Sequence, residues 1–118
     1  MRTFAQQAKH LSAVIYLVSA AALEQKPPVD TGGESGPDSV KTKEQIVQFM
    51  KDAFAYAHKA AQSLTAKNQL DLVPSAFGSG KAPRAGMVGM IAWHTFDHYG
   101  QMVVYLRMNG IVPPASAK

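Results

Sequence analysis

Apolar side chains recur with helical spacing in three stretches of the chain, and stretches rich in Pro and Gly separate them. The first stretch predicts a helix from about residue 2 or 3 to residue 23, with Thr3 and Gln6 in capping-box spacing at its start. At about 100° per residue, one narrow stripe of this helix carries His10, Val14, Leu17 and Ala21. His10 is therefore expected to point into the core.

The second stretch predicts an amphipathic helix over residues 42–66, because its apolar positions follow the i, i+3, i+4 spacing throughout. Those positions are Ile46, Phe49, Met50, Ala53, Phe54, Ala57, Ala60 and Leu64. Thr42 and Gln45 repeat the capping-box spacing. We expect this helix to pack by one face.

The third stretch predicts a helix over residues 83–109, because Pro83 suits a first helical turn and Gly110 suits the position after the last one. This helix is apolar nearly all round. The side chains that point away from the His94 face are Trp93, Phe96, Tyr99, Val103, Val104 and Leu106. Such a helix is expected to be buried on more than one side.

Residues 24–41 and 67–82 combine several prolines and glycines with few apolar side chains, so both are predicted to be irregular loops, the first of them flexible. No stretch reads as a convincing strand. With 118 residues the chain fits one domain, residues 1–118, built on one core. The predicted fold class is all-α, an up-and-down helical bundle with three long helices in this chain.

The composition limits the chemistry that the chain can support. Hydrophobic residues make up 47% and charged residues 17%, as in ordinary globular proteins. The net charge of +4 is spread along the chain without a basic cluster, which gives no support to nucleic-acid binding. The chain has no cysteine, so any metal must be held by nitrogen and oxygen donors.

The apolar run over residues 11–23, preceded by basic residues, is similar to a secretory signal, and it is too short to span a bilayer. Polar side chains interrupt the N-terminal stretch at Gln6, Gln7, His10 and Tyr16, and its helical periodicity is not required of a signal. We therefore interpret it as a helix of the fold and expect a cytoplasmic protein that does not bind membranes.

Histidines supply the candidate chemistry. His94 and His98 are spaced i, i+4, which places them about 40° apart on one helical face. Zinc and related ions need at least three protein ligands, and the inward-facing His10 is the suited third candidate. His58 has no partner at metal spacing and is expected to lie elsewhere. For His10 alone, the alternative is a core or interface histidine bonded to a carbonyl, and His58 reads as a solvated or rim residue.

Gln101 and Tyr105 lie one and two turns beyond His98. They are candidates to line a pocket, to orient a metal ligand or to contact a cofactor or substrate. A purely structural hydrogen bond is the alternative.

The segment from His94 to Pro114, HTFDHYGQMVVYLRMNGIVPP, resembles the last-helix signature of the DinB-like superfamily of metal-binding four-helix bundles. Residues 2–10, RTFAQQAKH, resemble that family's second helix, whose histidine is the first of three metal ligands. The resemblance implies His10, His94 and His98 as metal ligands. Family members begin with a further long helix, and Met1 falls where their second helix starts. Either the sequence is truncated or another copy of the chain supplies the absent packing surface.

The resemblance also implies a function. Three protein ligands on zinc or nickel, or else on iron or manganese, leave a coordination position open. Relatives include S-transferases and isomerases that use a low-molecular-weight thiol such as mycothiol, bacillithiol or glutathione, so we hypothesise a metal-dependent transferase or hydrolase acting on a small-molecule thiol or electrophile. The alternative is a non-catalytic, stress-related metal-binding or interaction protein with a structural metal. The apolar last helix further predicts a homodimer built on it.

Overall fold

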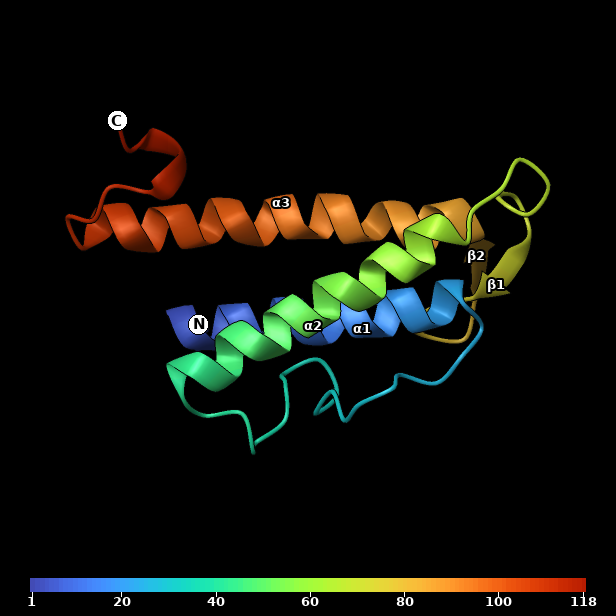
Figure 1. Cartoon of the computed structure of the whole chain (residues 1–118), viewed down its shortest axis with the longest axis horizontal. Helices are drawn as coiled ribbons and strands as arrows, with labels where there is room; N and C mark the ends of the chain where they lie inside the picture. The colour runs from blue at the N-terminus through green and yellow to red at the C-terminus, as the bar shows by residue number, and fades with distance from the viewer.

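The computed structural model describes the whole chain, residues 1–118, as a mainly helical fold, which confirms the predicted class (Figure 1). The elements in chain order are α1 (Phe4–Ala22), α2 (Lys43–Gln62), β1 (Leu72–Pro74), β2 (Lys81–Pro83), α3 (Arg84–Met108) and the short 3-10 helix η1 (Pro114–Ser116). Helices α1 and α3 lie side by side and antiparallel, and α2 crosses α1 (Figure 1). None of these helices has the length and apolar character that a membrane span requires.

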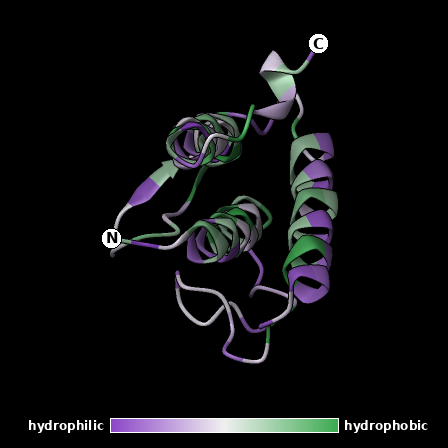
Figure 2. Ribbon diagram, turned by 90° about the vertical axis from the view of Figure 1, so that its left-hand side faces the viewer, coloured by the Kyte–Doolittle hydropathy of each residue, from purple (hydrophilic) through white to green (hydrophobic).

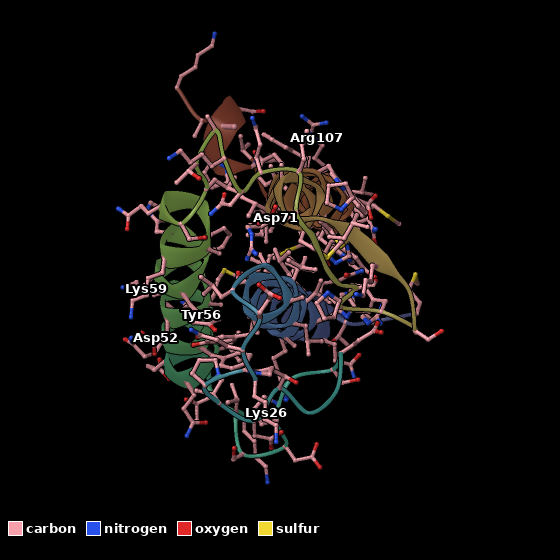
Figure 3. All side chains as sticks on the ribbon, turned by 90° about the vertical axis from the view of Figure 1, so that its right-hand side faces the viewer. Lys26, Asp52, Tyr56, Lys59, Asp71 and Arg107 are labelled. Atoms are coloured by element: carbon pink, nitrogen blue, oxygen red, sulfur yellow. The ribbon has the colours of Figure 1, made fainter.

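Helix α1 is the centre of the fold. Viewed along its axis, it has α3 on one side, the loop that follows it on the opposite side and α2 along a third side (Figures 2 and 3). Most of its residues are buried, including Ser12, whose hydroxyl donates to the Ala8 carbonyl at 2.8 Å. Many of its side chains are Ala or Ser, and small side chains let neighbouring elements approach closely from several directions. The sequence had predicted burial on more than one side for the third helix instead.

Helix α2 packs by one face, as predicted. The buried positions on this face are Phe49, Ala53, Ala57 and Ala60. Phe49, Ala53 and Ala57 form a core cluster with Leu11, Ile15 and Tyr16 of α1. The opposite face projects outward, and Asp52 and Lys59 are seen there in Figure 3. Both predicted capping boxes are present, at Thr3 and Thr42.

Two sequence expectations are wrong between residues 62 and 83. Helix α2 ends at Gln62, because the side chains of Thr65 and Asn68 hydrogen-bond each other's backbone amides and Asn68 also donates to the Ser63 carbonyl at 2.9 Å. The second loop contains an antiparallel hairpin of β1 and β2 where no strand was expected. Each strand has only three residues and includes a proline, which is too short for a period of two to be read.

Helix α3 begins directly after Pro83 and ends at Met108, with the predicted glycine two residues beyond its end. Gly110 has a φ of +70°, and the amides of Gly110 and Ile111 donate to the Arg107 and Leu106 carbonyls at 3.1 and 2.9 Å. Within one chain, however, only Met87 and His98 of α3 are buried. The expectation that this helix is buried on more than one side is therefore not met by a single chain.

The loop over residues 24–41 runs along α1, and part of it is held tightly. Gly36 is buried with a φ of +80°, and its amide donates to the Thr31 carbonyl at 2.9 Å. A Cβ at Gly36 would lie 2.9 Å from Cβ of Lys9, so only glycine fits this approach to α1. The loop was predicted to be a flexible surface segment, but this turn fixes Glu34 beside the first helix.

Candidate metal centre

Three histidines from two helices converge between α1 and α3. One ring nitrogen from each of His10, His94 and His98 lies within 4.8 Å of the other two. Their ring centroids are 4.4 to 5.5 Å apart. The three histidines do converge, but the spacing of 4.8 Å is wider than the roughly 4 Å that we expect of the ring nitrogens even without a metal. His58 lies elsewhere, exposed on α2 beside an apolar groove.

Contacts at both ends of the helix pair set the register that brings these residues together. At one end the Arg84 guanidinium donates to the Ala22 carbonyl and pairs with Glu24 at 2.8 Å. At the other end the Tyr105 hydroxyl donates to the Arg2 carbonyl. With the antiparallel helices joined at both ends, His10 lies opposite the i, i+4 pair of α3.

The His10 ring is oriented by a backbone atom of the loop. Its Nδ1 donates to the Glu34 carbonyl at 2.6 Å. A carbonyl can only accept, so the hydrogen of the neutral ring resides on Nδ1 and the lone pair is on Nε2. This is the arrangement found at protein metal sites, where the distal nitrogen binds the ion and the other donates to a carbonyl or carboxylate.

The His98 ring is oriented by a side chain of α1. Its Nδ1 donates to Oε1 of Gln7 at 2.7 Å, and both residues are only 4% exposed. Sequence reasoning did not single out Gln7 or Glu34. Gln7 stands one turn before His10 on the same helical face, so its spacing could have identified it. The Glu34 contact had no signal in the sequence, because it is made by a backbone atom.

The His94 ring has a buried Nε2 with no hydrogen-bond partner. Buried polar atoms are normally paired, so an unpaired one at the meeting point of three imidazoles indicates a place for a ligand. Burial lowers the pKa of His94, with a further contribution from His10. Burial, followed by the nearby His94 and His10, lowers the pKa of His98 to about 4. Both rings are therefore neutral at pH 7, the form that binds metals.

Gln101 and Tyr105 share a cleft of about 370 Å³ near this cluster. Its walls are formed by Met1, Gln7, Gln101, Val104, Tyr105, Met108 and Asn109. Gln101 accepts from Nε2 of Gln7 at 2.9 Å, so it reaches His98 through one intervening side chain. The Tyr105 hydroxyl donates to the Arg2 carbonyl just before α1 and makes no hydrogen bond to a histidine. The cleft adjoins the cluster through Gln7.

A cluster of three imidazoles, held between two antiparallel helices in a chain without cysteine, defines a helical protein with a site that could bind a metal. The sequence profile of the DinB superfamily matches residues 1–102, and the chain belongs to this superfamily. Neither the curated proteins nor the solved structures gave a match to the chain.

Proposed function

We propose that the protein binds one divalent metal ion through His10, His94 and His98, with zinc or nickel ahead of iron or manganese. The observation that carries the proposal is the buried, unpartnered Nε2 of His94, beside two rings whose Nδ1 atoms are already engaged. Ligand nitrogens of tetrahedral zinc lie about 2.0 to 2.1 Å from the ion and hence about 3.4 Å from one another. One ring nitrogen of each histidine lies within 4.8 Å of the other two, so these three atoms would need to close by at most about 1.4 Å to hold zinc.

We further propose that the site is catalytic, of the thiol S-transferase or hydrolase type. Three protein ligands leave a fourth position open, where a bound ion would lower the pKa of a thiol or a water. The cleft beside Gln7 supports this proposal. Its volume of about 370 Å³ falls in the range of small-molecule sites, and its wall combines apolar side chains with the amides of Gln7 and Gln101.

The alternative is a structural ion that ties α1 to α3 without catalysis. The burial of the site favours it, because His10 and His98 are each only 4% exposed. In addition, none of the four main clefts is lined by a histidine of the cluster. Access of an exogenous ligand to the ion therefore distinguishes the two functions.

Metal analysis of protein purified without chelating resin tests the binding site. We expect one equivalent in the wild type and in His58→Ala, and none in His94→Ala. Cobalt-substituted protein then tests the open position, because a small thiol such as 2-mercaptoethanol would add a thiolate charge-transfer band. An unchanged spectrum would favour the structural role, and a wild type without metal would refute the whole proposal.

We also propose that two copies associate through α3. The large apolar side chains that a single chain leaves exposed on this helix are Trp93, Phe96, Tyr99, Val104 and Met108. Phe96 is 73% exposed, and a Cβ at Gly100 would meet nothing within 4 Å, so the space beside this glycine is free for a partner helix. A homodimer, or an exchange of elements between copies, would cover this surface.

A further inference from the structure

A chain of three hydrogen bonds connects His98 to a carboxylate on the surface of α3. His98 Nδ1 lies 2.7 Å from Gln7 Oε1, Gln7 Nε2 lies 2.9 Å from Gln101 Oε1, and Gln101 Nε2 lies 3.1 Å from Asp97 Oδ2. Asp97 and Gln101 are one turn apart on α3, and Gln7 reaches across from α1. This series of hydrogen bonds thus starts at the exposed Asp97 and ends at the buried His98 ring.

The exposed end of this series of hydrogen bonds determines which atom donates and which accepts at each step. An ionised carboxylate can only accept, so the Gln101 atom beside Asp97 must be the amide nitrogen. The Gln101 oxygen then faces Gln7 and requires the Gln7 nitrogen as its donor. The Gln7 oxygen is consequently left for His98, and it can only accept. Reversing either amide would place two acceptors or two donors against each other.

We infer that Asp97, acting through Gln101 and Gln7, selects the His98 tautomer that carries its hydrogen on Nδ1 and offers Nε2 to a metal ion. Asp97, Gln101 and Gln7 are positioning residues in this scheme. The inference deepens the proposed function and rests on it for its consequence. For His10, the Glu34 carbonyl imposes the same tautomer directly, whereas for His98 a reversible pair of amides stands between the ring and the acceptor.

Asp97→Asn tests the inference, because an amide at this position can donate as well as accept and no longer fixes the direction. The Gln101 and Gln7 amides can then reverse together, so that the Gln7 nitrogen faces His98 and the hydrogen of the ring moves to Nε2. We expect a mixture of tautomers in the metal-free protein and a loss of about tenfold in zinc affinity, at the lower end of the range for outer partners of metal ligands. Asp97 is exposed, so the fold is expected to tolerate the change.

Gln7→Glu in the Asp97→Asn background is the rescue variant. A carboxylate at this position accepts from His98 whatever lies beyond it, as in the carboxylate and histidine pairs of many zinc sites. Both the tautomer and the affinity should return. The matched control is Asp52→Asn, which removes a carboxylate from an equivalent i, i+4 pair with Gln48 on α2, bonded at 2.8 Å but without a link to a histidine.

Two measurements separate this inference from the proposed function. Long-range proton–nitrogen spectra of the metal-free protein report the His98 tautomer, and competition with a chromogenic chelator reports zinc affinity. Affinities are compared at high salt, where the Debye length falls to about 3 Å at 1 M, so that the loss of negative charge contributes little. If Asp97→Asn retains the wild-type tautomer, the inference is wrong even where zinc binds normally. If the wild type fails to bind zinc, the proposed function fails, and the tautomer of the variant still decides the inference.

Discussion

Acidification of the metal-free protein should destabilise it through the histidine cluster. The pKa of His98 lies at about 4 in the folded chain and near 6.5 in an unfolded one, so below pH 6.5 the unfolded state binds the proton more readily. The contribution of His98 to the free energy of unfolding is therefore fully present above pH 6.5 and is lost as the pH decreases toward 4. Below pH 4 this group causes no further loss of stability. The lowered pKa of His94 acts in the same direction.

The size of this loss of stability follows from the lowered pKa of His98. A pKa lowered from 6.5 to about 4, chiefly by burial and then by the neighbouring His94 and His10, corresponds to at most about 3.4 kcal/mol of stability. This is a large part of the roughly 5 to 15 kcal/mol that stabilises a typical domain. Urea unfolding in the presence of EDTA, repeated between about pH 7.5 and 4, measures it.

Carboxylates also lose stabilising contacts on acidification, so the informative quantity is a difference between variants. His98→Gln removes the titrating ring and should flatten the free energy of unfolding over this range relative to the wild type. His58→Gln removes an exposed histidine and should leave the wild-type curve unchanged. Parallel curves for the wild type and His98→Gln would show that the ring does not titrate as its burial requires.

The other predictions concern the ion, the loop and assembly. Zinc at about a hundredfold excess over its Kd should raise the free energy of unfolding by about 2.7 kcal/mol in the wild type and in His58→Ala but not in His94→Ala, as seen in urea titrations. Gly36→Ala should lower the free energy of unfolding by about 1 to 3 kcal/mol in the same assay, because its φ is +80° and the new Cβ would clash with Lys9. Gly80→Ala is the control and should leave the free energy of unfolding unchanged, because a Cβ there meets no neighbour. Equal losses in the two variants would contradict the tight turn. Light scattering should show a dimer that Phe96→Glu dissociates, and a wild-type monomer at micromolar concentration would rule out the proposed assembly.

The three helices and most of their limits could be predicted from the sequence because short-range interactions decide them, although the end of α2 at Gln62 was expected at residue 66. The capping box of Thr3 and Gln6 and the glycine stop at Gly110 involve residues within five positions of each other. The pairing of His94 with His98 follows from the pitch of one helix in the same way. The small hairpin escaped prediction because its strands are too short for a pattern, and the pairing of its strands is what stabilises it.

The tertiary structure alone decided which helix is central and what surrounds each histidine. Helix α1 takes the centre because its small side chains admit neighbours from several sides, whereas α3, although more apolar in its large side chains, stays half exposed within one chain. The inward position of His10 was readable from helical spacing, but its closeness to His98 depends on the register between α1 and α3, which contacts at the far ends of both helices set. The orienting contacts of His10 and His98 cross 24 and 91 positions of the sequence. Hydrogen bonds over such separations form only when packing brings the partners together, so no local pattern could have revealed them.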